Sequence, residues 1–308
     1  MSRPVPGMPQ QFSLRRWLLD RLCLRPTTHE LDFRPQELFW IEDTPLRLAC
    51  YRQAQVPRSR ADSETLDIAD RTVELLIIKF PGNAGRAELS PIHPANVWPE
   101  KRIEVWSINP PGYGQSPGRA SLDHVPAIAR SVWQAAQREH PNTPVLVYGN
   151  SIGSLTAMRT IAVALEDQQA PALGLLLRNP PDLFPLIMEH RRRWYHGPVP
   201  RWLTSPAILR TDDVAAENRV TSGSPSHLDS VALASACHCP LLLVQAELDR
   251  MVPPTNQDRV FSAHPGPKSK FIIPAADHHQ APDPADQEVY QGYTAAIAQT
   301  FSAIISPN

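Results

Sequence analysis

Apolar runs of strand length alternate along this chain with longer stretches of helical periodicity. Prolines, 34 of them against 13 glycines, stand mainly between the runs, where they start or stop elements. Strands that are separated by helices form a mostly parallel, doubly wound sheet covered on both faces. The sequence therefore predicts the α/β class, with a sheet of about eight strands whose first two form an antiparallel pair. We expect these strands at residues 38–41, 46–52, 73–80, 103–109, 144–148, 173–177, 241–245 and 271–273.

Length and composition favour a single large globular domain. The 308 residues are 42% apolar and 20% charged, which is unlike a disordered or fibrous chain. A net charge of −1 gives no support to a nucleic-acid partner. We find no apolar stretch long enough to span a bilayer and no signal peptide, so the expected location is the cytoplasm.

The cysteines give no sign of a disulfide framework or of a metal site. The four cysteines are few and scattered for a chain of this length, so reduced, partly buried thiols are expected. Cys237, His238 and Cys239 are metal-ligand types, but no second cluster with suitable spacing accompanies them. We expect neither a metal nor another cofactor.

A strand-to-helix turn in the middle of the chain carries the strongest chemical signal. The pentapeptide Gly149-Asn150-Ser151-Ile152-Gly153 joins the strand at 144–148 to a helix predicted at 152–166. A serine hydroxyl is a weak nucleophile unless it is held clear of the backbone beside a base, and such a turn does this. Glycines two residues to either side let the strand and the helix approach closely. The pattern predicts that Ser151 is a nucleophile.

Two further segments resemble motifs of the α/β-hydrolase fold superfamily. The strand at 73–80 is followed by Pro81-Gly82-Asn83-Ala84-Gly85, which is similar to the superfamily's oxyanion loop with proline in place of the usual histidine. The segment 109–116 is similar to its glycine-rich turn after the next strand, with asparagine where aspartate is common. The resemblance implies that the backbone amides of Asn83 and Ile152 bind an oxyanion.

The same resemblance implies an acid and a histidine, which follow the nucleophile in that order. Asp249, just beyond the strand at 241–245, matches the acid, and Asp182 is the position from which some members supply it instead. His278, after an Ala-Asp pair, matches the base, and His279 is the second candidate. Glu247 lies nearer its strand than the usual acid and is expected to be a neighbour.

The resemblance implies a serine hydrolase, similar to esterases and lipases, that cleaves a carboxylic ester through an acyl-enzyme. Its partner would be a small acyl ester. The same fold also serves thioesterases, acyltransferases and serine peptidases, and those alternatives stay open. A non-catalytic ligand-binding protein of this fold is the alternative from another class, although a complete Ser, Asp and His set argues against it. The sequence does not indicate an oligomeric state.

Two segments stand outside the alternation. Residues 1–35 form an N-terminal arm before the main domain at 36–308, with a short basic amphipathic helix at 12–24. That helix either packs on the domain or touches a membrane surface weakly, and its shortness favours packing. Residues 183–236 lack a clear strand and are predicted to be an inserted helical cap over the site. Its candidate substrate-binding side chains are Trp194, Tyr195 and Trp202.

Overall fold

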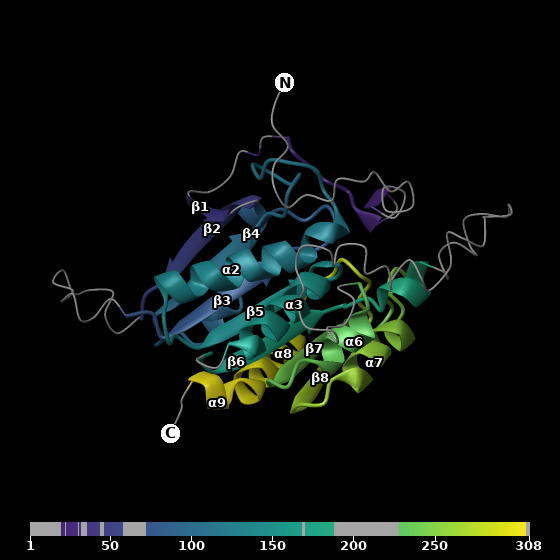
Figure 1. The fold of residues 1–308 in the computed structure, drawn as a ribbon. Coiled ribbons are helices and arrows are strands. Elements are labelled where there is room, and N and C mark those ends of the chain that lie inside the picture. The colour runs from purple at the N-terminus through teal and green to yellow at the C-terminus, as the bar shows by residue number, and fades with distance from the viewer. Residues whose placement is uncertain are drawn as a thin grey trace, which may run out of the picture.

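The computed structural model describes residues 20–21, 23–29, 31, 36–43, 46–57, 72–167, 170–187 and 228–305. Its strands form one eight-stranded sheet in the order β1-β2-β4-β3-β5-β6-β7-β8 (Figure 1). The β1–β2 and β2–β4 pairs are antiparallel, and the remaining pairs are parallel. The predicted α/β class and the mostly parallel sheet are confirmed. The strands are β1 (Glu37–Asp43), β2 (Leu46–Gln55), β3 (Leu75–Phe80), β4 (Ile103–Ile108), β5 (Val145–Asn150), β6 (Leu173–Arg178), β7 (Leu241–Ala246) and β8 (Lys268–Ile273).

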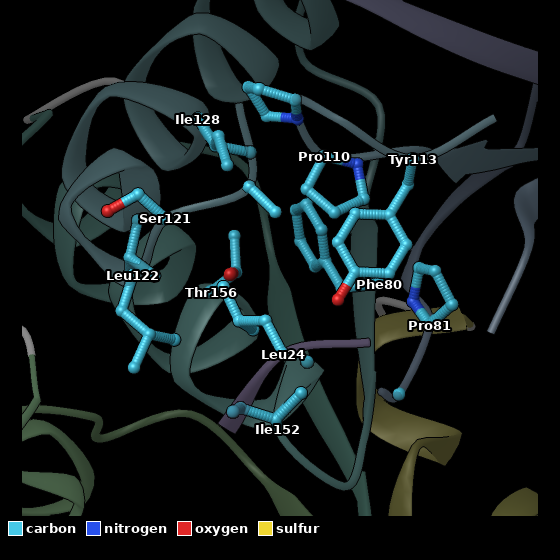
Figure 2. Close-up of a pocket in the computed structure, with 15 residues that line it drawn as sticks. Leu24, Phe80, Pro81, Pro110, Tyr113, Ser121, Leu122, Ile128, Ile152 and Thr156 are labelled. Atoms are coloured by element: carbon cyan, nitrogen blue, oxygen red, sulfur yellow. The ribbon is translucent and has the colours of Figure 1, made fainter. Parts of the chain in front are cut away.

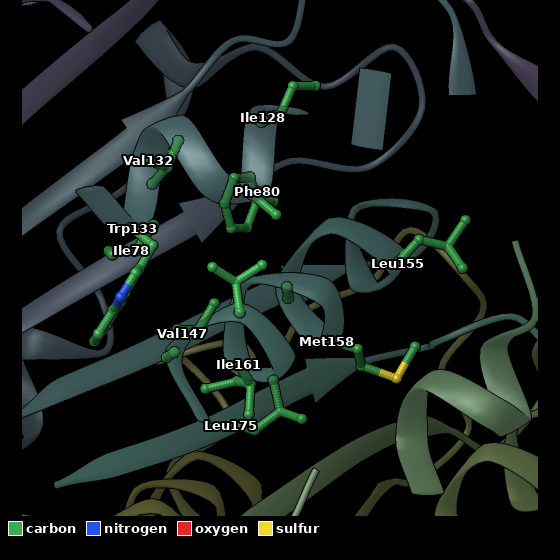
Figure 3. Packing of buried hydrophobic residues seen from close by; sticks show 14 of the residues in the cluster. Ile78, Phe80, Ile128, Val132, Trp133, Val147, Leu155, Met158, Ile161 and Leu175 are labelled. Carbon is green, nitrogen blue, oxygen red and sulfur yellow. The ribbon is translucent and has the colours of Figure 1, made fainter. Parts of the chain in front are cut away.

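Helices cover both faces of this sheet. On one face, α2 (Val125–Glu139) and α3 (Gly153–Glu166) pack together, and α6 (Ser230–Ser235) and α7 (Pro254–Ala263) lie beside them. Figure 3 shows Ile78, Val147 and Leu175 of the strands in this core. The other face is covered by α8 (Gln287–Thr300) and α9 (Ser302–Ile305). Short 3-10 helices are η3 (Ala87–Leu89), η4 (Ala95–Val97) and η5 (Leu122–His124).

The central strands are buried along their whole length because helices cover both of their faces. Every residue of β3, β4 and β7 is buried, whereas β8, at the edge of the sheet, keeps exposed residues. The strand β5 lies between β3 and β6, so its carboxyl end opens at the middle of the sheet edge. Ligands of doubly wound folds bind beyond such strand ends.

Some helix boundaries differ from the sequence prediction for local reasons. The sequence predicts an amphipathic helix at 121–139. In the structure this segment starts as η5, where the Ser121 hydroxyl accepts a hydrogen bond from the Asp123 amide, and continues as α2. The sequence also predicts a closing helix at 290–305, which begins earlier, at Gln287, because Asp286 caps it through the Val289 amide. The sequence did not predict α7, which starts directly after Pro253.

The predicted cap falls mainly outside the described residues. Positions 188–227 are not described, so Trp194, Tyr195 and Trp202 cannot be placed. The end of the predicted cap contains α6, which packs against α3 and α7. In the described part of the chain, no helix is both long enough and apolar enough to cross a membrane.

Candidate active site

Ser151 stands at the sharp turn between β5 and α3. Its backbone φ is +50°, the strained left-handed conformation expected for a nucleophile at such a turn. Strand and helix approach so closely that a Cβ on Gly149 would lie 2.6 Å from the Ser154 Cα. A Cβ on Gly153 would lie 2.4 Å from the carbonyl oxygen of Phe80. Both glycines are therefore required by the turn that presents the serine.

Three predicted side chains form one hydrogen-bonded chain. The Nε2 atom of His278 lies 3.0 Å from the Ser151 Oγ, and its Nδ1 lies 2.7 Å from the Asp249 Oδ2. All three residues are buried. They come from loops after three different strands, β5, β7 and β8, which meet at the carboxyl edge of the sheet. The arrangement has the geometry of a nucleophile, a base and an orienting acid.

The carboxylate of Asp249 is held by further donors. Its Oδ1 accepts hydrogen bonds from the Met251 and Val252 amides, at 2.9 and 2.8 Å. Its Oδ2, which faces His278, also accepts one from the Gln257 Nε2 at 3.1 Å. The acid is therefore fixed in one orientation, and Gln257 is a contributor that sequence reasoning missed because it lies on the unpredicted helix α7.

The alternative residues have other partners. The Asp182 carboxylate accepts a hydrogen bond from Arg259 Nε at 2.5 Å, and burial raises the pKa of Asp182. Glu247 accepts one from the Ala275 amide, in the turn that leads to the histidine, so it is the neighbour that we expected. His279 is exposed, and its ring meets the His278 ring edge-on at 5.4 Å between centroids. Of the two histidines, His278 is the one that contacts Ser151.

The expected oxyanion residues flank the serine. Ile152 follows Ser151 directly at the start of α3. On the other side, a Cβ on Gly82 would lie 3.2 Å from the Ser151 Cβ, so the loop that carries Asn83 passes beside the serine. The Asn83 side chain is occupied elsewhere, because its Oδ1 accepts hydrogen bonds from the Arg25 amide and the Tyr113 hydroxyl.

A pocket opens beside Ile152 and beside Gly82, the neighbour of Asn83 (Figure 2). Its empty space, part of which is open to solvent, is about 550 Å³, and both Gly82 and Ile152 line it. Most of the other side chains that line it are apolar. Three lining side chains carry a hydroxyl group, namely Tyr113, Ser121 and Thr156. The apolar lining includes Leu24, Phe80, Pro110, Leu122, Val125 and Ile128.

Residues 93–291 match the model of the alpha/beta hydrolase family. The chain belongs to this family. An uncharacterised protein of Mycobacterium tuberculosis (strain H37Rv) is 28% identical over 170 residues, which are 54% of this chain and 50% of that protein. The uncharacterised protein YfhR of Escherichia coli (strain K12) is 22% identical over 218 residues, covering 70% and 66% of the two chains. This hydrolase-family chain thus spans about half the length of the mycobacterial relative.

Solved structures share the fold of the family. An esterase of Pyrococcus furiosus superposes with a TM-score of 0.57 at 13% identity, covering 92% of this chain and 98% of the esterase. Est1E of Butyrivibrio proteoclasticus, solved with ferulic acid bound, gives 0.57 at 17% identity, covering 87% and 99%. At these identities the likeness concerns the fold alone.

In this family member, Asn179 supports the histidine loop, and sequence reasoning missed it. It directly follows β6 with a φ of +48°, and its Nδ2 donates to the His278 carbonyl at 3.0 Å. Its Oδ1 accepts from the Ala246 amide at 2.9 Å. Arg178 adds a hydrogen bond from its Nη2 to the His279 carbonyl at 3.0 Å. An asparagine between a strand and two prolines is a signal that could have drawn attention to this position.

The cysteine pair of the hydrolase chain is part of its core. The Cys237 thiol donates to the carbonyls of Met158 and Leu233, and burial raises its pKa well above the usual value. Burial also raises the pKa of Cys239 to about 12. Among the residues that the structure describes, no group of three or more His, Cys, Asp or Glu side chains has a metal-binding arrangement.

Proposed function

We propose that the chain is a serine hydrolase that cleaves carboxylic esters through an acyl-enzyme. The observation that carries the proposal is the unbroken series of contacts from Ser151 to His278 to Asp249, with distances of 3.0 and 2.7 Å. A structural role alone does not require a serine in a left-handed turn within reach of a buried, carboxylate-bound imidazole.

In the proposed reaction, His278 Nε2 takes the Ser151 hydroxyl proton as the oxygen attacks the ester carbonyl carbon. Asp249 accepts the hydrogen bond from Nδ1 and stabilises the imidazolium that forms. The carbonyl oxygen becomes an oxyanion, which the amides of Asn83 and Ile152 would bind. The imidazolium then gives its proton to the departing alcohol, and an acyl-serine ester remains.

Water completes the cycle. His278, now neutral again, takes a proton from a water molecule that attacks the acyl carbon. The second tetrahedral oxyanion collapses, the bond to the Ser151 oxygen breaks, and that oxygen regains a proton from the imidazolium. The products are a carboxylic acid and an alcohol. Thioesters and amides would pass through the same steps, and an alcohol in place of water would give acyl transfer.

Activity-based labelling tests the nucleophile. A fluorophosphonate forms a covalent bond to an activated serine, so the wild-type protein is expected to be labelled and Ser151→Ala to remain unlabelled. Ser107→Ala is the matched control, because Ser107 is a buried serine of β4 away from the site. Equal labelling of the wild type and Ser151→Ala would contradict the proposal.

Turnover separates an enzyme from a ligand-binding protein of the same fold. p-Nitrophenyl acetate and butyrate, a butyryl thioester and a butyryl anilide are offered at equal concentration. We expect ester hydrolysis that is lost in Ser151→Ala and in His278→Ala but retained in His279→Ala. No Ser151-dependent turnover of any substrate would favour the non-catalytic alternative. A preference for the thioester or the anilide would change the assigned substrate class.

A further inference from the structure

Part of the N-terminal arm is docked against the site. We call residues 20–21 and 23–29 the arm segment. It is hydrogen-bonded to the connections that follow β3 and β4, and its Arg25 amide donates to the Asn83 side chain in the first of them. A segment held at several points along its length has a defined position rather than a nonspecific contact. The other bonds run from the Leu122 amide to Asp20 Oδ1 (3.0 Å), from the Gly114 amide to the Thr27 carbonyl (2.9 Å) and from Arg86 Nη1 to the His29 carbonyl (3.0 Å).

Asp20 anchors the start of this segment. Its side chain is buried against η5, where its Oδ1 accepts a hydrogen bond from the Leu122 amide. Its Oδ2 lies 3.7 Å from Arg119 Nη2. Burial raises the pKa of Asp20. A buried carboxylate without such partners would be costly, so these contacts hold the carboxylate at this point.

Leu24, four residues further on, lines the same pocket as Ile152, the residue that follows Ser151 (Figure 2). It also packs against the core cluster that α2 and α3 share with the sheet. Facing it in the lining are apolar side chains from the β3 and β4 loops and from α2. The arm segment therefore supplies part of a binding surface that the main domain alone leaves incomplete.

The position of the pocket indicates which part of an ester it would take. The departing alcohol must lie near His278, because that residue gives it a proton. The loops after β7 and β8, which carry Asp249 and His278, contribute no residue to the pocket lining. The lining comes instead from the oxyanion side of Ser151, through Gly82 and Ile152. The pocket thus lies on the side of the acyl group.

We propose that the arm segment forms a wall of the acyl-binding pocket, and that Leu24 limits the length of the aliphatic acyl chain that the enzyme accepts. This inference rests on the proposed ester hydrolysis. The pocket takes an uncharged aliphatic chain, because the described residues that line it are mostly apolar and none of them is charged. The contact between the Arg25 amide and Asn83 ties the same segment to the loop expected to bind the oxyanion.

The test compares chain-length selectivity in two variants of opposite size. The value of kcat/KM is measured for p-nitrophenyl acetate, butyrate and octanoate with the wild type, Leu24→Ala and Leu24→Trp. Leu24→Ala is expected to raise the octanoate-to-acetate ratio by about tenfold, and Leu24→Trp to lower it by about the same factor. The matched control is Leu165→Ala, the same change at a leucine of α3 that is 42% exposed and outside the pocket, which should leave the ratio unchanged.

Opposite shifts of the octanoate-to-acetate ratio in the two Leu24 variants cannot come from loss of fold, since unfolding lowers kcat/KM for every ester alike. Ratios that stay within about twofold in both variants, while hydrolysis still depends on Ser151, would overturn the role of Leu24 and leave the proposed function standing. A second series, acetate esters of increasingly long alcohols, checks the side of the pocket. If only that series responds to Leu24, the acyl assignment is wrong. If no ester is hydrolysed in a Ser151-dependent way, both proposals fail together.

Discussion

Asp249 illustrates how much of the site depends on one carboxylate. Its two oxygens are not equivalent, because Oδ1 accepts hydrogen bonds only from the Met251 and Val252 amides, whereas Oδ2 faces His278. Backbone donors cannot turn away, so the orientation of the carboxylate is set by the loop after β7. With Oδ2 as the acceptor, the imidazole carries its proton on Nδ1 and leaves Nε2 free to take the Ser151 proton.

Asp249→Asn should therefore reverse the histidine tautomer. The amide oxygen would stay with the two backbone donors and direct the NH₂ group at His278 Nδ1. The histidine proton would then lie on Nε2, where it blocks proton uptake from the serine. We expect kcat for p-nitrophenyl butyrate to fall by roughly 10³- to 10⁴-fold. Because the new NH₂ group also removes the acceptor of the Gln257 Nε2, the midpoint of thermal unfolding is expected to fall as well. Asp182→Asn is the control, because that carboxylate pairs with Arg259, and an equal loss there would contradict the assignment.

At the scale of elements, the ends of β6, β7 and β8 are joined by a single side chain. Asn179 bonds to the Ala246 amide at the end of β7 and to the carbonyl of His278 in the loop after β8. It does so from a left-handed backbone, a conformation that asparagine tolerates better than most residues. We propose that it is a positioning residue, which would act on the proposed reaction through His278.

Asn179→Ala is expected to lower both stability and turnover. The buried Ala246 amide would lose its partner, at a cost of about 1–3 kcal/mol in the free energy of unfolding. Because alanine tolerates the left-handed conformation less well than asparagine, the backbone at position 179 would add about 1 kcal/mol to this loss of stability. Asn142→Ala isolates the second contribution, because Asn142 also has a positive φ, of 65°, but its side chain is exposed.

Urea denaturation measures the stability difference between the two asparagine variants. Ester kinetics then separate positioning from simple destabilisation. We expect kcat to fall in Asn179→Ala with KM nearly unchanged, and neither constant to change in Asn142→Ala. Equal losses of stability in the two variants, with normal kcat in both, would show that the Asn179 contacts are dispensable.

At the scale of the whole molecule, a buried amine links stability to pH. The Lys79 Nζ donates to the carbonyls of Pro91 and His93, at 2.6 and 2.8 Å, under the loop that leads into η4. Burial lowers the pKa of Lys79 from 10.5 to about 7. Burial, with the nearby Lys79 amine, also lowers the pKa of His93 to about 4, although a hydrogen bond to Asn96 acts in the opposite direction. Both bases bind protons more weakly in the folded chain.

The free energy of unfolding should therefore rise with pH. Between pH 7 and 10.5 the unfolded chain holds the Lys79 proton more tightly than the folded chain, so the free energy of unfolding rises with pH. His93 makes a contribution of the same sign between pH 4 and 6.5. For Lys79 the slope reaches at most about 1.4 kcal/mol per pH unit. Denaturation at pH 7, 8 and 9 should show this rise in the wild type and a flatter one in Lys79→Met. Lys101→Met, at a partly exposed lysine, should keep the wild-type slope. Parallel slopes in all three proteins would contradict the link.

Local patterns predicted the positions of the strands along the chain and the turn at Ser151. Largely apolar runs of strand length identified β3, β4, β5, β6 and β7, because such strands are buried on both faces. The Pro-initiated α7 was missed, because most of its residues are polar. The three residues named for the site lie together, while their catalytic role stays a prediction to be tested.

The sequence by itself determined the class of fold, the nucleophile turn, and an acid and a histidine in the right chain order. These features depend on contacts between near neighbours in the chain or on the burial of one strand in the core. Both produce a recognisable pattern of residue types in the sequence. Only the tertiary structure showed that His278 rather than His279 contacts Ser151, revealed the contacts of Asn179 and Gln257, and placed Leu24 at the pocket. Each of these depends on contacts between loops far apart in the chain, and the direction of a side chain on a loop is set by whatever packs against it.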